Sequence, residues 1–312
     1  MIKNGNPGFL IKGLFKNKDG NQNAVSYSQD IKGNKKIKIN KNTITKRKDL
    51  LGLNSVVVFS PEEEAITKGP PGERRRFYNK IFSICSNTYL EKLLTYNKVL
   101  KQRNAALRDN HKKQKTAEHL EIWSEPLARA ATKLWNERSC LLEEFADEFK
   151  KTTKKIDEKI KVTIKYKEKE TDVAKIFREI NNNNTQDLKN GFTSYGPHRD
   201  DVLFLWNKKG IRKHGSQGEH KLFLALLKIT ELLFLSKKTK KNPIFLIDDL
   251  FASLDKEKSK KLLAFAGKLQ SERKKRQQTI ITTTDLVDLE KNGFFLDFKQ
   301  VKKHHIYKNG NT

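Results

Sequence analysis

Two adjacent carboxylates, Asp248 and Asp249, are the residues of this chain whose sequence context most directly suggests a catalytic or metal-binding site. They follow an apolar run from Ile244 to Ile247 that Pro243 opens. Such a run is typical of a strand buried on both faces of a parallel sheet, and ligands bind beyond the carboxyl ends of these strands. One carboxylate could hold a hard cation such as Mg²⁺ while the other orients a water. The alternative is a helix N-cap that follows a buried strand.

Three further stretches flank this strand in a definite order. Upstream, the turn from His214 to Glu219 (HGSQGE) opens a long apolar helix that we expect from Lys221 to Leu235. Downstream, Ser253 to Asp255 (SLD) follows, and a second apolar strand, Thr279 to Asp285 (TIITTTD), ends in hydroxyls. In this order, the four stretches resemble the signature motif, Walker B strand, D-loop and switch of an ABC-type ATPase head.

Within that class, the resemblance narrows to the RecF family of bacterial DNA replication and repair proteins. The stretches that carry it cover nearly the whole chain: Val56–Pro61 (VVVFSP), Arg74–Phe77 (RRRF), Tyr96–Asn104 (YNKVLKQRN), Leu120–Trp123 (LEIW), Tyr195–Asp201 (YGPHRDD), Gly215–Gly218 (GSQG), and the Walker B and D-loop stretch. The resemblance implies an α/β fold, namely an ABC-type P-loop NTPase head with a mixed sheet, an N-terminal β meander and an inserted helical lobe.

The resemblance also implies chemical roles around the Walker B strand. Asp248 would hold Mg²⁺, and Asp249 would be the catalytic base that orients the water attacking ATP. Many ABC heads carry Glu at the second position, so the shorter Asp is compatible with slow turnover. Ser253 and Asp255 of the D-loop would couple the two heads of a homodimer, and Thr283 would be the switch residue.

The signature turn would act on the nucleotide of the other protomer. Ser216, Gln217 and Gly218 would touch the γ-phosphate of ATP held by that protomer. A hydroxyl and the N–H groups of a helix N-terminus complement the phosphate charge. Nucleotide binding would then close two heads over DNA, and hydrolysis would open them.

The phosphate-binding loop of such a head is not found in the sequence. A G-x-x-x-x-G-K-[ST] loop should cradle the nucleotide with its N–H groups. The nearest candidate, Gly69 to Gly72 (GPPG), is followed by Glu-Arg-Arg. The segment from Ile2 to Phe15 resembles family sequence that lies after the loop. We therefore expect the chain to lack the first strand, the loop and the following helix, and alone neither to bind ATP tightly nor to hydrolyse it.

The composition favours a polyanionic partner. The net charge is +28 and the pI is about 9.9, which indicates nucleic acid first and an anionic membrane surface second. Lysine carries most of the charge, and A/T-rich coding produces the same composition. Cys85 and Cys140 share no metal-ligand spacing and are expected to be reduced, packed thiols. With no apolar run of about 18 residues, the protein is expected to be soluble and cytoplasmic.

Periodicity divides the chain into three parts. Residues 1–85 are expected to form the N-terminal part of the head, residues 86–185 a helical lobe, and residues 186–312 the C-terminal part of the head. The first part would contain a β meander, a strand that leads into a Q-loop, and a helix, at Phe9–Phe15, Ala24–Tyr27, Ile37–Ile39, Val56–Phe59 and Glu73–Cys85.

Two long amphipathic helices are expected in the helical lobe, joined by the polar stretch from Arg108 to His119. The first would run from Tyr89 to Leu107. The second would be capped by Ser124, with Pro126 in its first turn, and would end near Lys151. The remaining elements are a strand, a helix, a linker and a strand, at Val162–Tyr166, Asp172–Ile180, Asn181–Asn184 and Val202–Trp206.

Two charged clusters have competing interpretations. The arginines from Arg74 to Arg76 are candidates for DNA contact, but three consecutive residues span too much of a helix to form one patch, so one is expected to pair internally. His198, Asp200 and Asp201 suggest a metal site. A hydrogen-bonded turn is the competing interpretation, because no fourth ligand accompanies them.

Three functions remain open from the sequence. The first is a RecF-like ATPase that binds duplex DNA at single-strand gaps and, with RecO- and RecR-like partners, assists recombinase loading and the SOS response. The second is a non-hydrolysing DNA-binding or dimerisation remnant of such a protein. The third, a generic nucleic-acid-coating protein, does not explain the ordered signature, Walker B and D-loop stretches, and no RNA-binding aromatic pattern supports it.

Overall fold

The computed structural model describes residues 2–16, 20–45, 50–112, 120–167, 169–248, 256–272, 278–283 and 301–304. The chain divides into two units, Met1–Val56 and Val57–Thr312, and each is described by itself. The predicted boundaries near residues 85 and 185 lie within the second unit and stay predictions.

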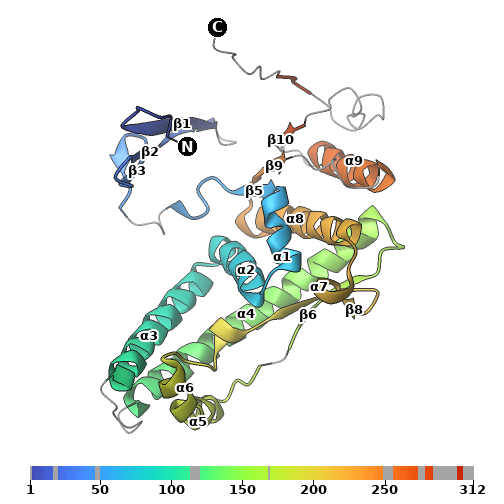
Figure 1. Cartoon of the computed structure of the whole chain (residues 1–312). Coiled ribbons are helices and arrows are strands. Elements are labelled where there is room, and N and C mark those ends of the chain that lie inside the picture. Colours follow the sequence, from blue (N-terminus) through green and yellow to red (C-terminus); the bar gives the residue numbers. More distant parts are fainter. Residues whose placement is uncertain are drawn as a thin grey trace. The chain divides into compact units, whose positions relative to one another are not determined.

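The first unit contains the predicted antiparallel meander. Its strands are β1 (Gly8–Lys16), β2 (Gln22–Asp30), β3 (Lys35–Ile39) and β4 (Asn42–Thr43), paired in that order (Figure 1). Gly33 has a φ of 84° in the turn between β2 and β3, a left-handed conformation that glycine adopts without steric cost. Cross-strand pairs such as Ile11 with Tyr27 fix the register and therefore the two faces of the sheet.

A second sheet holds the predicted Walker B strand. Its order is β10 (Thr279–Thr282), β9 (Ile244–Asp248) and β5 (Val56–Phe59), and β9 and β10 are parallel (Figure 1). Phe245 and Ile247 are buried, whereas Ile244 and Leu246 are half-buried. The strand and its parallel pairing were predicted, but the described residues cover one face of β9 more fully than the other.

Helix α8 (Gln217–Thr239) is the centre of the hydrophobic core, and its buried residues extend around the whole helix from Leu222 to Ser236. Phe223 packs against Phe149 of α4 and Phe204 of β7, with ring centroids 5.2 and 5.0 Å apart. Phe234 packs against Phe145 of α4 at 5.3 Å. A helix that is apolar all round must be enclosed by other elements, and here α4 (Glu121–Ile156), α2 (Pro71–Cys85) and β7 (Val202–Trp206) contact it.

The two long helices are α3 (Asn87–Lys112) and α4, which pack against one another. The predicted start of α4 is wrong, because the helix begins at Glu121 and Ser124 lies inside it. The Ser124 hydroxyl donates to the Leu120 carbonyl at 3.2 Å, and both side chains are fully buried. Tertiary burial at the helix start has therefore overridden the local capping signal. The helix also continues past Lys151 to Ile156.

Two short helices follow near one end of α3 and α4. Helix α5 (Val173–Asn182) starts with Asp172 as its N-cap, whose carboxylate accepts from the Ala174 and Lys175 N–H groups at 2.7 and 3.3 Å. Helix α6 (Asn184–Asn190) begins two residues later. The predicted linker from Asn181 to Asn184 is thus wrong, because these asparagines end one helix and begin the next.

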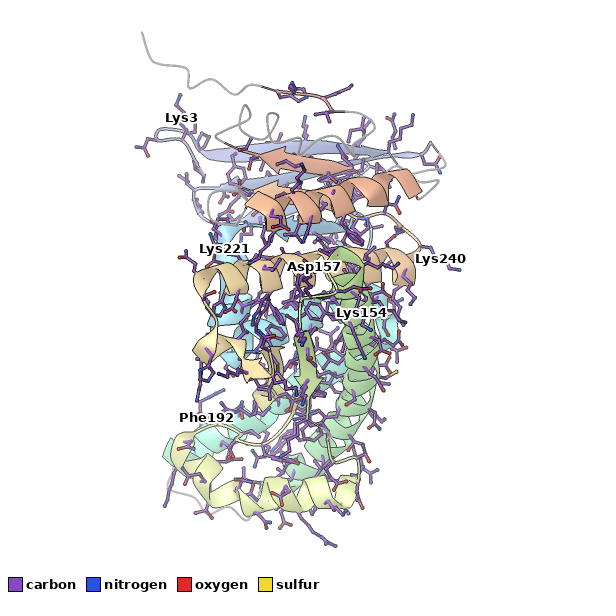
Figure 2. All side chains as sticks on the ribbon, turned by 90° about the vertical axis from the view of Figure 1, so that its right-hand side faces the viewer. Lys3, Lys154, Asp157, Phe192, Lys221 and Lys240 are labelled. Carbon is purple, nitrogen blue, oxygen red and sulfur yellow. The ribbon has the colours of Figure 1, made fainter. Side chains whose placement is uncertain are left out.

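A third sheet pairs β6 (Val162–Tyr166), β7 and β8 (Lys209–Gly210) in antiparallel order. The remaining described elements are η2 (Pro61–Glu64), α1 (Ala65–Lys68), η4 (Pro197–Arg199), α7 (Ile211–His214) and α9 (Lys256–Glu272). Asp157, labelled in Figure 2, follows the end of α4 and pairs with Lys261 of α9 at 2.9 Å. Among the described helices, none has the length and apolar character needed to span a membrane.

The two cysteines are free and differ in environment. Burial raises the pKa of the Cys85 thiol to about 12, as expected of a packed, unreactive thiol. Cys140 is exposed, so the prediction that both thiols are packed is wrong for this one.

Candidate functional site

The predicted signature turn forms the N-terminus of α8. Ser216 is the N-cap, and its Oγ accepts from the Glu219 N–H at 3.3 Å while Glu219 Oε2 accepts from the Ser216 N–H at 2.7 Å. This reciprocal capping box fixes the start of the helix. Ser216 and Gln217 are exposed, and a Cβ at Gly218 would meet nothing within 4 Å. The N-terminus is therefore open to an anion from solvent.

Gly215 allows the chain to enter this helix from α7. A Cβ at this position would lie 2.6 Å from Ile211 Cγ1 and 2.7 Å from the Ile211 carbonyl oxygen. The chain closes tightly on Ile211, which is itself buried, and only glycine fits without a shift. Gly215 thus positions the exposed Ser216–Gly218 turn.

Asp248 is exposed at the carboxyl end of β9, as predicted. The parallel register places Thr282 beside it, and the Thr282 hydroxyl donates to Asp248 Oδ1. Thr283, the predicted switch residue, comes next after the end of β10. Carboxylate and hydroxyl oxygens are suitable ligands for Mg²⁺, although the described residues contain no cluster of three His, Cys, Asp or Glu side chains that could hold a metal.

The other predicted residues of this edge lie outside the described part of the chain. These are Asp249, the predicted base, and Ser253 and Asp255 of the predicted D-loop. Their roles stay predictions.

Ion pairs join the segment after β5 to α8. Glu63 of η2 pairs with Lys228 at 2.5 Å, and Lys228 also pairs with Glu231 at 2.5 Å. Glu64 pairs with Lys221, one of the residues labelled in Figure 2, at 3.6 Å. Lys221 and Lys228 are seven residues apart, so they lie on one side of the helix. The predicted Q-loop segment is therefore held against the helix that begins at the signature turn.

The three arginines of α2 point in different directions. Arg74 is buried and forms a forked pair with Asp201, with Nε–Oδ1 at 2.7 Å and Nη2–Oδ2 at 3.1 Å. Arg75 donates to the Asp200 carbonyl at 2.6 Å. The Arg76 side chain is 77% exposed. Internal pairing of one arginine was predicted, and both Arg74 and Arg75 bond within the protein. Arg76 pairs with Glu73 at 2.9 Å on the surface, and DNA contact by the trio stays a prediction.

Asp200 is the acceptor in a buried polar cluster. It accepts from the Trp135 Nε1–H at 2.8 Å and from the Tyr166 hydroxyl, and it pairs with Arg138 at 2.9 Å and Lys169 at 2.7 Å. These partners satisfy both carboxylate oxygens within the protein.

His198 is held in the same turn. Its Nδ1 lies 2.5 Å from the Tyr96 hydroxyl and its Nε2 lies 2.9 Å from the Thr193 carbonyl oxygen. Burial lowers the pKa of His198 to about 4. Gly196 has a φ of 141°, and a Cβ there would lie 2.4 Å from the Tyr96 hydroxyl. Together with the pairing of Asp200 and Asp201, these contacts favour the hydrogen-bonded turn over a metal site.

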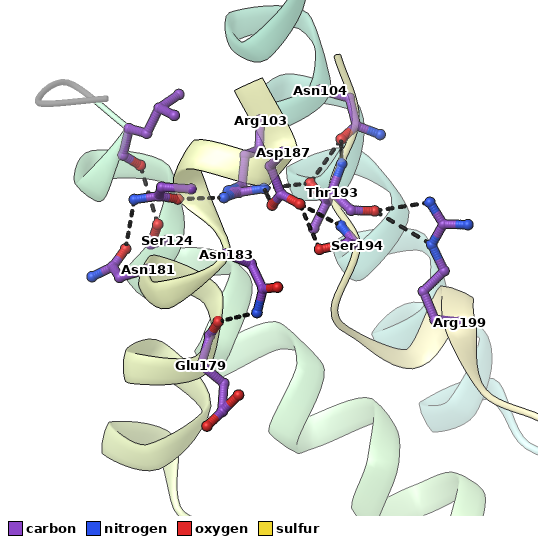
Figure 3. A network of polar contacts seen from close by, with 12 residues as sticks. Arg103, Asn104, Ser124, Glu179, Asn181, Asn183, Asp187, Thr193, Ser194 and Arg199 are labelled. Carbon is purple, nitrogen blue, oxygen red and sulfur yellow. Dashed lines mark hydrogen bonds and ion pairs between the residues drawn. The ribbon is translucent and has the colours of Figure 1, made fainter. Parts of the chain in front are cut away.

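A second buried network lies nearby, between α3 and α6 (Figure 3). Arg103 is fully buried and donates to Asp187 at 2.8 Å, Thr193 at 2.6 Å and Asn184 at 2.7 Å. Asn104 accepts from the Thr193 N–H at 2.9 Å. Residues of the YNKVLKQRN stretch are thus joined to three residues that lie 81 to 90 positions further along the chain, just before the YGPHRDD stretch.

Known proteins similar to this chain are DNA repair proteins. The "DNA replication and repair protein RecF" of Geotalea daltonii is 33% identical over 289 residues, which cover 90% of this chain and 76% of that protein. The protein of the same description from Prosthecochloris aestuarii is 32% identical over 294 residues, covering 90% and 77%. The chain belongs to the RecF family of DNA replication and repair proteins. No family model matches the chain.

Solved RecF structures have the same fold. A structure of the recombination mediator protein RecF with ATP, in the RecFOR pathway, superposes with a TM-score of 0.78 at 29% identity. The superposed residues make up 92% of this chain and 77% of the RecF chain. A second structure, RecF-ATPrS, gives a TM-score of 0.76 at 30% identity and covers 91% and 77%. The predicted α/β ATPase-head fold, with its N-terminal antiparallel sheet and helical region, is confirmed.

The structure also adds residues that the sequence interpretation missed. Thr282 contacts Asp248 through the parallel register, and the run of three threonines was its signal in the sequence. Glu219 completes the capping box, which the spacing Ser-x-x-Glu signals directly. Glu63 and Lys228 had no sequence signal, because their pairing depends on how η2 packs on α8.

Proposed function

We propose that this RecF-family chain binds duplex DNA at single-strand gaps and that its heads close on one another around ATP. The single observation that carries the proposal is the geometry of α8 and β9. An exposed, Ser216-capped helix N-terminus is available to a phosphate, and an exposed Asp248 with a threonine partner ends a strand of a parallel pair. Both features are what a phosphate and its counter-cation require.

Each exposed group of this edge has a distinct part in the proposal. Ser216, Gln217 and Gly218 bind the terminal phosphate of a nucleotide held by the partner protomer, through a hydroxyl and the N–H groups of the helix N-terminus. Asp248 would hold Mg²⁺ through an outer-shell water, and the cation would neutralise phosphate charge. Thr283 follows β10 at the same edge and senses the phosphate.

Two further sets of residues have proposed roles in the closed dimer. Asp249 orients the attacking water, and Ser253 and Asp255 of the D-loop contact the opposing head. These roles rest on the order of the motifs in the sequence. The ion pairs of η2 with α8 support a coupling of the two sides of the head, since the segment after β5 and the signature helix must then move together.

The proposed partners follow from the family and the charge. A net charge of +28 supports DNA as the polyanion. RecO- and RecR-like proteins are the proposed protein partners, in recombinase loading and in the SOS response. The cytoplasm, where chromosomal DNA is repaired, is the proposed location.

A second candidate function is non-hydrolysing DNA binding or dimerisation. The observation that favours it is the sequence, in which the 312 residues contain no G-x-x-x-x-G-K-[ST] loop. In this case the same edge serves the nucleotide of a partner protomer only. The chain by itself would bind DNA equally well with and without ATP.

Equilibrium binding to a gapped duplex tests the function. We expect the purified chain to bind a gapped duplex more tightly than an uninterrupted duplex of equal length. If Mg²⁺ and ATP strengthen this binding, and Ser216→Asp removes the increase, the first candidate holds and the expectation that the chain alone does not bind ATP tightly is wrong. Binding that ATP does not change supports the second. Equal, weak binding to both DNAs contradicts the proposed function.

Nucleotide turnover by the isolated chain is a separate test. We expect no Mg²⁺-dependent release of phosphate from ATP by the 312-residue polypeptide. Turnover that Asp249→Asn abolishes would contradict this expectation and would place a complete catalytic site within these residues.

A further inference from the structure

The antiparallel sheet of the first unit has two chemically different faces. The register places the aromatic and β-branched apolar side chains of β1, β2 and β3 on one face: Phe9, Ile11, Phe15, Val25, Tyr27, Ile37 and Ile39. The alternate residues lie on the other face, which we call the lysine face: Lys12 and Lys16 with Leu10 and Leu14 on β1, Ala24, Ser26 and Ser28 on β2, and Lys36 and Lys38 on β3. Four ammonium groups thus share one side of a rigid sheet.

The lysines of this face form two rows with short side chains between them. Lys12 is opposite Ser26, and Ser26 is opposite Lys38. The two rows are separated by two strand spacings, about 10 Å in total. On β1 the lysines alternate with the exposed Leu10 and Leu14, and between the two rows the central strand carries Gln22, Ala24, Ser26 and Ser28. Ammonium groups therefore border a central strand of mostly small, polar side chains.

Within the described residues of its unit, no acidic side chain pairs with the lysine face. Asp30 is the only acidic residue in the described part of Met1–Val56, and its carboxylate accepts from the Asn34 N–H at 2.9 Å and from Asn34 Nδ2 at 2.8 Å. None of the four lysines has an ion-pair partner among the described residues. Pairs of opposite charge on neighbouring strands stabilise a solvated antiparallel face, and the lysine face has no such pair among the described residues. A face built from one sign therefore favours a polyanion as its occupant.

We propose that the lysine face binds the phosphate backbone of duplex DNA, an inference that rests on the proposed function and names the surface for it. Lysine and serine are among the side chains that contact DNA phosphates, and such contacts carry no sequence information. Single-stranded DNA is instead held by stacking on aromatic rings, and here Phe9, Phe15 and Tyr27 all lie on the opposite face. Duplex backbone is thus the occupant that fits the face.

The salt dependence of duplex binding tests the proposal. We compare the full chain with a variant in which Lys12, Lys16, Lys36 and Lys38 are each changed to Gln, using a short uninterrupted duplex. Each phosphate contact contributes about 0.9 to the slope of log K against log salt. The slope should therefore fall by about 3.6 in magnitude, and affinity at low salt should fall at least about tenfold. The single variants should each lower the slope by about 0.9, which keeps the test valid should the quadruple variant misfold.

A matched control carries the same loss of charge elsewhere. Four exposed lysines on α3, α4 and α6 serve for this: Lys98, Lys101, Lys133 and Lys189. Changing all four to Gln should change the slope of log K against log salt by less than the value of about 0.9 expected for one phosphate contact. Changing the four sheet lysines to Arg should preserve the slope. Two results would overturn the lysine face and leave the proposed function intact. One is an equal fall of the slope in the helical control. The other is an unchanged slope in the sheet variant, provided that the wild type still binds duplex.

Two other polyanions give further decisive outcomes. When the four lysines are changed, the salt dependence of binding should fall less for a single-stranded oligonucleotide than for the duplex. Loss of binding to vesicles of anionic phospholipid, with duplex binding unchanged, overturns the proposal in favour of a membrane surface. No binding of wild type to any duplex overturns both the lysine face and the proposed function.

Discussion

Two pairs of adjacent aspartates have identical composition, and the described members of the two pairs lie in different environments. Asp200 is 5% exposed and Asp201 forms a forked pair with the buried Arg74, so both carboxylates of the first pair are occupied by partners within the protein. Asp248, the first member of the second pair, is exposed and its described partner is the Thr282 hydroxyl. The first pair precedes strand β7 and the second begins at the end of strand β9.

The comparison separates family motifs that hold the fold from motifs that face a ligand. The RRRF and YNKVLKQRN stretches each contact the YGPHRDD stretch, through the Arg74–Asp201 and Tyr96–His198 pairs, in which Arg74 and Tyr96 are buried. The signature turn and the end of β9 present Ser216 and Asp248 to solvent. A motif that is typical of a family is therefore not necessarily a site that binds or converts a ligand. Burial and completed hydrogen bonding distinguish the two kinds.

The largest effect on stability is expected at Arg103. Arg103→Met should lower the free energy of unfolding by about 3–5 kcal/mol, because it leaves the fully buried Asp187 without its cation. Urea unfolding measures this loss. Arg103→Met combined with Asp187→Leu should recover part of it, since no buried charge then remains. A loss below about 1 kcal/mol in the single variant would show that this network does not hold α3 to α6.

A smaller, pH-dependent effect is expected from His198. Burial lowers its pKa to about 4 from the ordinary value of 6.5, so the unfolded chain takes up the proton more readily than the folded chain. Stability from this group is complete above pH 6.5 and falls as the pH drops from 6.5 to 4. Between pH 7 and pH 5 the wild type should lose about 2 kcal/mol more than His198→Gln. Equal losses in the two proteins, measured by urea unfolding at both pH values, would contradict the burial of a neutral imidazole.

Two substitutions of Ser216 distinguish its role as a helix N-cap from its proposed role in phosphate binding. Ser216→Ala should cost about 1 kcal/mol through loss of the N-cap, whereas Ser216→Asp should retain stability because aspartate is an equally good cap. The aspartate nevertheless places a negative charge where the proposed phosphate binds, so any ATP-dependent gain in DNA affinity should disappear. Thermal unfolding and DNA binding in parallel measure the two effects. Retention of the ATP effect in Ser216→Asp would remove the signature turn from the proposed site.

The smallest effect is expected at Arg76. Its exposed pair with Glu73 contributes little, so Arg76→Gln should change the free energy of unfolding by no more than about 0.5 kcal/mol. Arg74→Gln, in contrast, leaves Asp201 without its forked partner and should be clearly destabilising. If both variants retain wild-type stability, the contrast between internal and external arginines is wrong.

Most local signals were interpreted correctly from the sequence, apart from the Ser124 cap and the Asn181–Asn184 linker, whereas contacts between distant residues were not predicted. The Ser216 turn, the strand that ends at Asp248 and the meander strands depend on neighbouring residues, whose periodicity and capping chemistry are visible directly. The pairing of Arg74 with Asp201 spans 127 positions, so nothing local could show which of three arginines turns inward. Ser124 was misplaced for the same reason, because burial among other helices outweighed its capping preference.

Urea unfolding of Asp200→Asn beside Asp248→Asn tests most directly whether the two aspartate pairs have opposite roles. Asp200→Asn leaves the buried Arg138 and Lys169 without a counter-charge and should lose about 3 kcal/mol or more. Asp248→Asn, at an exposed strand end, should stay within about 0.5 kcal/mol of wild type. Equal losses in the two variants would contradict the account, because Asp248 would then be part of the structure and not a group free to act on a ligand.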